Sequence, residues 1–283
     1  MIVAHTIDAV RQAVNEARSR GLSIGLVPTM GALHAGHISL IRSARQETGF
    51  VAVSIFVNPT QFGPTEDLER YPRPLTQDLR LCEEHKVDLV FVPEAGAMYP
   101  LEFRTAVGVQ ELQDMLCGAS RPGHFRGVAT VVLKLFNIVQ PDFAYFGQKD
   151  AQQARIIRQM VEDLNFPIRL RVCPTVREPD GLALSSRNQY LNPAQRESAK
   201  VLYQALELAR KQVERGERDA AVLCEILTSR IAATPGAVLS YAAVVDADTL
   251  RPLIRLKGEV LVALAVKFGT TRLIDNILLN IDV

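Results

Sequence analysis

A chain of 283 residues, 48% of them hydrophobic and 22% charged, is long enough for one large or two modest globular domains. Its 32 basic and 31 acidic residues leave a net charge of +1 without a long run of one sign. This balance disfavours nucleic-acid and membrane-surface binding and favours small-molecule partners. No apolar stretch approaches the roughly 18 residues that span a bilayer. Residues 1–21 carry Asp8 and Glu16 and predict a helix rather than a signal sequence, so we expect a cytoplasmic protein.

The cysteines are scattered along the chain without a C-x-x-C pair (Cys82, Cys117, Cys173 and Cys224). A chain of this size does not need disulfides to stabilise its fold. We therefore interpret these cysteines as small buried hydrophobic residues.

Short apolar runs, rich in β-branched or aromatic residues, predict strands at 22–28, 50–58, 87–93, 142–147 and 168–174. They are continuously apolar rather than alternating, which is typical of parallel strands covered on both faces. Helical patterns lie between them at 37–48, 75–86, 127–139 and 151–164. This order predicts an α/β fold, a doubly wound Rossmann-like parallel sheet whose ligands bind in the crevice at the carboxyl ends of the strands.

The pattern changes near residue 175. Residues 175–192 are polar and marked by glycine and proline, and two helical patterns follow before strand-like runs at 239–250 and 258–276. We therefore expect a Rossmann-like domain over residues 1–175 and a second, smaller α+β domain over residues 176–283.

The stretch 27–37, VPTMGALHAGH, leads from the first strand into a helix that we expect to begin near His37. A helix N-terminus offers unpaired N–H groups and the positive end of the helix dipole, which bind anions. Gly31 and Gly36 would let a ligand approach the backbone closely, and His34 and His37 could aim N–H groups at phosphate oxygens. The alternative is that both histidines only cap the helix and pack. The further ligands of a zinc site are not found near them.

Polar side chains also follow two other predicted strands. Asn58 and Gln61 carry neutral amides that can hold a hydroxyl and a carboxylate together, unless they form a simple Asn-Pro turn. Asp150 and Gln153 fit a helix-capping pattern. Lys149 is poorly placed beside a helix N-terminus unless it meets a polyphosphate.

The polar segment 181–191 contains Ser185, Ser186 and Arg187. These residues either form an ordinary turn or clamp a triphosphate from the second domain, which would then close over the cleft. The HAGH stretch resembles the H-x-G-H signature of the nucleotidylyltransferase superfamily, whose histidines contact ATP phosphates. The P-loop and dinucleotide-binding signatures are absent.

Taken together, the motifs closely resemble the pantoate–β-alanine ligase family. They are PTMGALHAGH, FVNPTQF, RPGHFRGVATVV, YFGQKDAQQ and LALSSRNQYL, and the resemblance covers essentially the whole chain. It implies that the carboxylate of pantoate attacks the α-phosphorus of ATP to give pantoyl adenylate and pyrophosphate. The amine of β-alanine then displaces AMP, and the product is pantothenate, the precursor of coenzyme A.

The resemblance also implies roles for individual residues. The phosphate-binding and transition-state groups would be His34, His37, Lys149, Ser185 and Arg187. The ATP site would further include Met30, Gly147, Asp150 and Ser186, with Asp150 on the ribose. Pantoate would be held by Gln61 and Gln153, with Asn58 in the same pocket. The segment RPGHFRGV would bind the acidic substrate or shape the cleft through Arg121, His124 and Arg126.

Mg²⁺ would accompany ATP, held mainly by phosphates and water because magnesium rarely uses an all-protein cage. The family resemblance also implies a homodimer. Two other functions stay open at this point. One is a different nucleotidylyltransferase or a relative of the class I aminoacyl-tRNA synthetases, and the other is a non-catalytic nucleotide-binding protein.

Overall fold

The computed structural model describes residues 1–64 and 66–281, which form two compact units. The first unit comprises Met1–Asp114, Arg121–Gln148 and Gln153–Pro174. The second comprises Met115–Ser120, Lys149–Gln152 and the chain from Thr175 onward. The two short segments of the second unit lie within residues 1–175, the range predicted for the first domain, and one of them carries Lys149 and Asp150.

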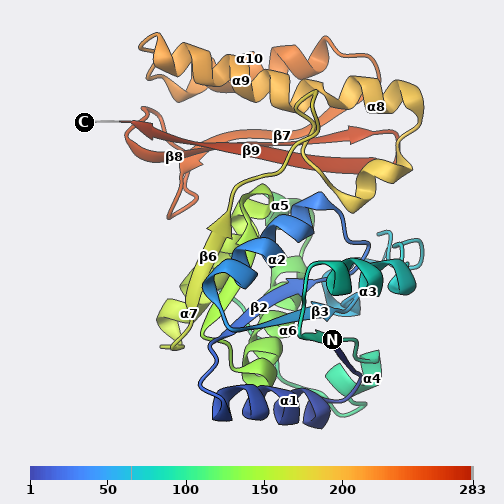
Figure 1. The fold of residues 1–283 in the computed structure, drawn as a ribbon. Coiled ribbons are helices and arrows are strands. Elements are labelled where there is room, and N and C mark those ends of the chain that lie inside the picture. The colour runs from blue at the N-terminus through green and yellow to red at the C-terminus, as the bar shows by residue number, and fades with distance from the viewer. Residues whose placement is uncertain (65, 282–283) are drawn as a thin grey trace. The chain divides into compact units, whose positions relative to one another are not determined.

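The first unit is built on a six-stranded sheet with the order β1-β4-β3-β2-β5-β6, in which every neighbouring pair is parallel (Figure 1). Its strands are β1 (Ile2–Ala4), β2 (Ile24–Thr29), β3 (Phe50–Ile55), β4 (Leu89–Phe91), β5 (Phe143–Gly147) and β6 (Arg169–Cys173). The chain moves outward from β2 to β3 and β4 and then returns to place β5 on the other side of β2. The strand order therefore reverses between β2 and β5, and ligands of open α/β sheets bind at the carboxyl ends of such strands.

The predicted parallel α/β fold is confirmed, but one strand was missed. Residues 1–21 were expected to be helical, whereas β1 (Ile2–Ala4) precedes α1 (Ile7–Ser19), which Thr6 caps by accepting a hydrogen bond from the backbone N–H of Ala9. A three-residue edge strand whose first two side chains are exposed carries no periodic signal. The N-terminal prediction was therefore wrong at this strand and right for the helix.

Both faces of the central strands β2, β3 and β4 are buried, whereas the edge strands β1 and β6 carry exposed side chains. The helices of the first unit are α1, α2 (Ala35–Glu47), α3 (Leu75–Glu84), α4 (Ala95–Met98), α6 (His124–Val139) and most of α7 (Ala151–Asp163), with 3-10 turns η1 (Pro59–Gln61) and η2 (Leu112–Asp114). The 3-10 turn η3 (Gln148–Asp150) has its first residue in this unit and the other two in the second. α2 packs over β2 and β5, while α1 packs against α6. Val27 joins the core under α2, and its neighbour Leu26, which points to the opposite face, is also fully buried.

The second unit carries a three-stranded antiparallel sheet, β7 (Ala237–Asp246), β8 (Gly258–Phe268) and β9 (Thr271–Ile281), in the order β7-β8-β9. Figure 1 shows α9 (Val201–Glu214) and α10 (Ala220–Ala232) covering one side of this sheet, and their apolar side chains share one core with it. The unit also contains α5 (Cys117–Ser120), η4 (Ser186–Tyr190) and α8 (Pro193–Ala199).

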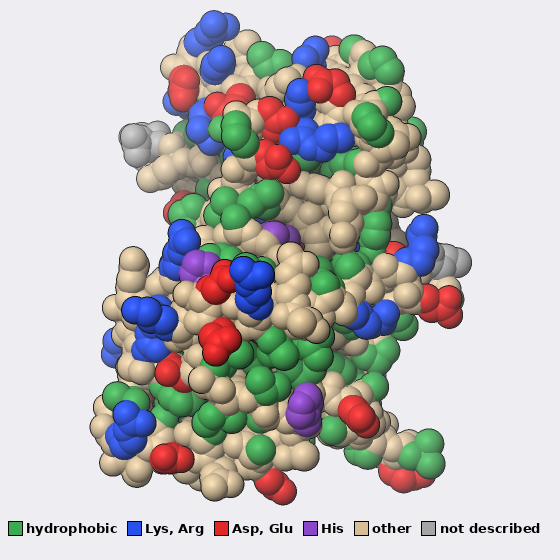
Figure 2. Space-filling model, turned by 45° about the vertical axis from the view of Figure 1, so that its right-hand side comes forward, with side chains coloured by type: hydrophobic (Ala, Val, Ile, Leu, Met, Phe, Trp, Pro, Cys, Tyr) green, Lys and Arg blue, Asp and Glu red, His purple; other side chains and the backbone are tan. Residues whose placement is uncertain are grey.

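The strand-like run at 258–276 was predicted as one element and is in fact two strands. A tight turn at Gly269, whose φ of +60° is left-handed, separates β8 from β9. The helical region likewise contains α8, α9 and α10 rather than two helices. None of the helices in the described residues is both long and apolar enough to cross a membrane. On the face shown in Figure 2, acidic and basic side chains are interspersed.

Candidate active site

The two histidines of the first loop lie together at the start of α2. The helix begins at Ala35, two residues before the expected position, and His34 is its N-cap. The Nδ1 atom of His34 accepts a hydrogen bond from the backbone N–H of Gly36 at 3.1 Å, and Nδ1 of His37 accepts one from the backbone N–H of His34 at 3.3 Å. The ring centroids are 4.2 Å apart.

This capping arrangement also decides which ring nitrogen can act as a donor. Because each Nδ1 accepts a backbone N–H, a neutral imidazole at either position carries its proton on Nε2. Nε2–H is then the group that can donate to a phosphate oxygen. The capping interpretation and the phosphate interpretation of the sequence are therefore compatible, since they use different nitrogens of the same rings.

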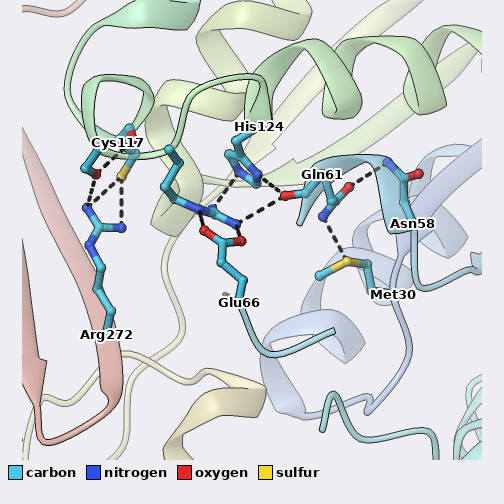
Figure 3. A network of polar contacts seen from close by, with 9 residues as sticks. Met30, Asn58, Gln61, Glu66, Cys117, His124 and Arg272 are labelled. Atoms are coloured by element: carbon cyan, nitrogen blue, oxygen red, sulfur yellow. Dashed lines mark hydrogen bonds and ion pairs between the residues drawn. The ribbon is translucent and has the colours of Figure 1, made fainter. Parts of the chain in front are cut away.

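Gln61 lies at the end of the turn that follows β3, and its side chain is held on both sides. Its Oε1 accepts from Nδ2 of Asn58 at 3.0 Å, and its Nε2 contacts the Met30 sulfur at 2.9 Å (Figure 3). Gln61 is 8% exposed and Asn58 is 1% exposed. The structure thus brings together three predicted site residues from the loops after β2 and β3.

Asn58 acts as a bracket for this turn. Its Nδ2 also donates to the carbonyl of Gly127 on α6 at 3.2 Å, while its Oδ1 accepts from the Thr60 backbone N–H and from the hydroxyls of Thr60 and Tyr99. Because both atoms of its amide form hydrogen bonds within the protein, Asn58 holds the side chain of Gln61 in place. Direct contact between Asn58 and pantoate stays a prediction.

The segment RPGHFRGV supports the same turn from the other side (Figure 3). The Arg121 guanidinium donates to both carboxylate oxygens of Glu66 at 2.6 Å and to the Gln61 carbonyl at 3.3 Å. It also lies 2.8 Å from Nε2 of His124, whose Nδ1 lies 2.7 Å from the Gln61 carbonyl. Because arginine only donates, Nε2 of His124 accepts, and the ring proton sits on Nδ1 and points at the carbonyl.

Burial opposes the ionisation of Glu66, but the hydrogen bonds and charge of Arg121 outweigh it, so the pKa of Glu66 lies below its ordinary value. Charge-assisted bidentate pairs of this kind hold geometry well. Arg121 and His124 therefore hold the Gln61 turn through their hydrogen bonds, and the roles expected for them at the cleft stay predictions. Glu66 and Tyr99 were missed in the sequence, where neither belongs to a recognisable motif.

The remaining predicted residues of the first unit occupy the loop after β5 and the helix beyond it. Gly147 ends β5, and a Cβ built on it would meet no described atom within 4 Å. Gln153 lies in the first turn of α7 and is partly buried. Gly147 therefore lies at the carboxyl edge of β5, beside the point where the strand order reverses.

In the second unit, Lys149 is fixed through its backbone and paired through its side chain. Nδ2 of Asn276 donates to the Lys149 carbonyl at 2.9 Å, and the Lys149 ammonium lies 3.5 Å from the Asp150 carboxylate. The neighbouring Asp275 is 2% exposed, and its carboxylate accepts two hydrogen bonds from Arg177 at 2.6 and 2.9 Å. Burial raises the pKa of Asp275 despite this pairing.

The serine and arginine residues of the 181–191 segment form η4. Ser185 is its N-cap, and the Ser185 hydroxyl accepts from the Arg187 backbone N–H at 3.3 Å. Ser186 and Arg187 follow in the same turn and are partly buried. The turn is also tied to the preceding segment, because Nδ2 of Asn188 donates to the Ala183 carbonyl at 3.0 Å. The three predicted residues thus share one short turn.

Within residues 1–64 and 66–281, no three His, Cys, Asp or Glu side chains come together in a way that could hold a metal ion. The predicted polar side chains of the first unit are imidazoles and amides, and those of the second unit are hydroxyls, cations and the carboxylate of Asp150. Such a set suits the binding of an anionic, phosphorylated ligand beside a small carboxylic acid.

Comparison with known proteins gives a consistent result. Residues 2–278 match the family model described as Pantoate-beta-alanine ligase. The pantothenate synthetase of Moorella thermoacetica is 59% identical over 282 residues, covering 100% of both chains, and that of Acetivibrio thermocellus is 52% identical over 281 residues, covering 99% of this chain and 100% of the relative.

Two solved structures are similar over almost the whole chain. The pantothenate synthetase of Thermus thermophilus has 46% identity and a TM-score of 0.93, with 98% of this chain and 99% of that chain covered. The pantoate-beta-alanine ligase of Francisella tularensis, complexed with beta-gamma ATP and beta-alanine, has 38% identity and a TM-score of 0.80, with 98% and 97% covered.

Proposed function

Because this chain belongs to the pantoate–β-alanine ligase family, we propose that it joins pantoate to β-alanine through a pantoyl adenylate intermediate. The chain is an ATP-dependent ligase of pantothenate biosynthesis. The observation that carries the two-step route is the contact between Gln61 and Met30, which joins the amide turn to the histidine loop. A carboxylic acid held by the amides would lie close to a phosphate held at the start of α2.

In the first step, an oxygen of the pantoate carboxylate bonds to the α-phosphorus of ATP. The bond from that phosphorus to the bridging oxygen breaks, and pyrophosphate leaves with the electron pair. Charge grows on the phosphate oxygens, so catalysis requires positioning and neutralisation more than a protein nucleophile. His34 and His37 would donate from Nε2 to these oxygens, and the N-terminus of α2 would add its positive dipole end.

In the second step, the amine of β-alanine attacks the acyl carbon of the adenylate. The carbon–oxygen bond to the phosphate breaks, AMP leaves, and the amine loses a proton as the amide forms. Gln61 and Gln153 would hold the pantoyl group throughout, because neutral amides can both donate to its carbonyl and accept from its hydroxyls. A site that excludes water would protect the mixed anhydride from hydrolysis.

The second unit would supply cations and hydroxyls to the nucleotide. We assign the triphosphate to Lys149, Ser185, Ser186 and Arg187, and the ribose to Asp150. Lys149 is suited to this role because Asn276 fixes its backbone, while the nearest carboxylate that pairs with its ammonium, that of Asp150, is partly exposed. Closure of this unit over the cleft stays a prediction.

Mg²⁺ belongs to this proposal as a companion of ATP. The donor sets of the described residues do not form a metal cage, so the ion would enter with the substrate, bound by phosphates and water. The free thiols of Cys82, Cys117, Cys173 and Cys224 fit a reducing compartment, and we propose the cytoplasm. A homodimer and the lack of a nucleic-acid partner are further parts of the proposal.

The test is pyrophosphate exchange into ATP in the presence of Mg²⁺, with pantoate compared against other carboxylic acids. Exchange that requires pantoate is expected. Exchange independent of pantoate would overturn the substrate assignment, and ATP binding without any exchange would favour the non-catalytic alternative. Sedimentation in the same buffer would test the dimer.

A further inference from the structure

Asp78, on the buried side of α3, contacts the histidine loop from a distant part of the sequence. It is 1% exposed. One carboxylate oxygen accepts from the backbone N–H of Leu33 at 2.8 Å, and the other accepts from the backbone N–H of Ala32 at 2.9 Å. These two residues directly precede His34. One side chain thus holds two consecutive backbone groups of the loop.

The loop needs such a partner because its backbone is unusual. Gly31 and Ala32 both have left-handed φ values, +81° and +50°, and Ala32 is not a glycine. Successive N–H groups in this kind of turn form a concavity that binds an anionic oxygen. Asp78 fills that concavity so closely that a Cβ on Gly31 would lie 2.9 Å from its Oδ2. The turn and the carboxylate are therefore fitted to each other.

The burial of the Asp78 carboxylate is not explained by a gain in the stability of the fold. Burial raises its pKa even though the two N–H groups stabilise the charged form. Asp78 makes no ion pair in the described part of the chain, and an ionised carboxylate buried without a cation disfavours folding. What Asp78 does is fix the path of the backbone into His34, which caps α2 and whose own N–H binds His37.

We propose that Asp78 is a positioning residue that holds the 31–33 turn in the conformation from which His34 and His37 present Nε2 to the phosphates of ATP. The proposal rests on the function proposed above for the two histidines. It concerns the carboxylate itself, because an asparagine at position 78 could accept only through Oδ1 and would turn an NH₂ donor towards a backbone donor.

The first experiment compares Asp78→Asn with Asp142→Asn. Asp142 is a matched control because its carboxylate also accepts a backbone N–H, that of Ile24 at 2.7 Å, at the opposite end of the strand that leads to the histidine loop. In pantoate-dependent pyrophosphate exchange, Asp78→Asn should lower kcat by about 10- to 100-fold, the scale of a 1 Å misplacement, with little change in the KM for pantoate. Asp142→Asn should keep the wild-type kcat.

If Asp78 had only a structural role, Asp78→Asn would lower the melting temperature, but the folded fraction of the variant would keep the wild-type kcat. The proposal is therefore overturned if Asp78→Asn keeps the wild-type kcat. It is equally overturned if kcat falls only in proportion to the fraction of unfolded protein.

The second experiment measures the tautomeric state of the histidine side chains. The chain has five histidines, so ¹⁵N spectra of the imidazoles can be assigned by single His→Gln replacements. In the wild type, the ¹⁵N signals of His34 and His37 should be those of the Nε2–H tautomer alone. In Asp78→Asn these two histidines should show a mixture of tautomers, whereas the signals of His5 and His85 should not change. Unaltered His34 and His37 signals in the variant would refute the positioning role.

A third measurement uses the wild-type protein and does not depend on the folding of a variant. The amides of Ala32 and Leu33 should be protected from hydrogen exchange, and protection should fall as acid protonates Asp78. Exchange at the rate of an open loop would refute the proposal. The variants His34→Ala and His37→Ala distinguish a failure of the proposed histidine chemistry from a failure of the inference about Asp78. If both keep full activity, the proposed histidine chemistry fails, whereas if both lose activity and Asp78→Asn does not, only the inference about Asp78 fails.

Discussion

Replacement of Gly127 by alanine tests whether the Gln61 turn is held in place by close backbone packing. A Cβ at Gly127 on α6 would lie 2.3 Å from the Thr60 carbonyl oxygen and 2.8 Å from the Gln61 nitrogen. Ordinary contact begins at 3.4 Å, so α6 and the turn must separate by about 1.1 Å. Both partners are backbone atoms, so no side-chain rotation can relieve the contact.

Two opposing effects set the magnitude of the change in stability. Alanine inside a helix gains about 1 kcal/mol over glycine, whereas overpacking of a close contact costs about 1–3 kcal/mol. The net change in the free energy of unfolding should therefore be small and destabilising. A displacement of Gln61 by about 1 Å, by contrast, is expected to lower kcat/KM for pantoate by up to about 100-fold.

The assay is pantoate-dependent pyrophosphate exchange combined with thermal unfolding. Gly96→Ala in α4 is the matched control, since a Cβ there would meet no described atom within 4 Å. Gly96→Ala should keep wild-type kinetics and a slightly raised melting temperature. If Gly127→Ala behaves in the same way, the packing of α6 against the turn does not position Gln61, and the argument from geometry is wrong.

Three further variants test other parts of the site. Gln61→Ala should weaken pantoate binding by about 1–3 kcal/mol, the loss of a buried hydrogen bond, while the KM for ATP changes little; equal weakening of both ligands would indicate damaged folding instead. Lys149→Ala should slow adenylate formation by about 10²- to 10³-fold and affect attack of β-alanine on synthetic pantoyl adenylate less, which single-turnover assays on both substrates can separate. Glu66→Gln should lower the melting temperature at neutral pH. Because Arg121 holds the pKa of Glu66 below 4.5 against the effect of burial, the stabilisation is present above that pH and should vanish as pH falls through the folded-state pKa; a difference that persists in acid would contradict this.

The sequence predicted the elements whose signal is local. Apolar runs identified five strands of the parallel sheet, because strands covered on both faces, such as β3 and β4, are buried at every position. β6 was found although Arg169 and Arg171 alternate with its apolar residues and are exposed. β1 escaped because three residues at an exposed edge show no pattern. The join between β8 and β9 escaped because Gly269 makes a tight turn inside an otherwise apolar run.

The loops of the candidate site could be singled out from the sequence, but the side chains that hold these loops in place could not. His34, Asn58 and Gln61 lie in short motifs that follow strands, where position alone suggests chemistry. Asp78 and Glu66 lie in segments that read as an ordinary helix and a polar loop. Asp78 accepts a hydrogen bond from Leu33, 45 residues away along the chain, and Glu66 accepts one from Arg121, 55 residues away. Only the fold brings these partners together, so the sequence does not reveal them.

The use of amides rather than a cation beside the proposed pantoate pocket has a chemical reason. Arg121 lies next to Gln61, yet its guanidinium is committed to Glu66 and to the Gln61 carbonyl. A free arginine would bind the pantoate carboxylate tightly, and that same carboxylate must act as the nucleophile. Ground-state binding of this kind lowers the energy of the nucleophile without stabilising the transition state, so it slows the chemical step. Neutral amides can orient pantoate through weaker bonds and leave the negative charge of its attacking oxygen available. The Glu66–Arg121 pair braces the turn, and in the proposed site it would also keep a cation away from the nucleophile.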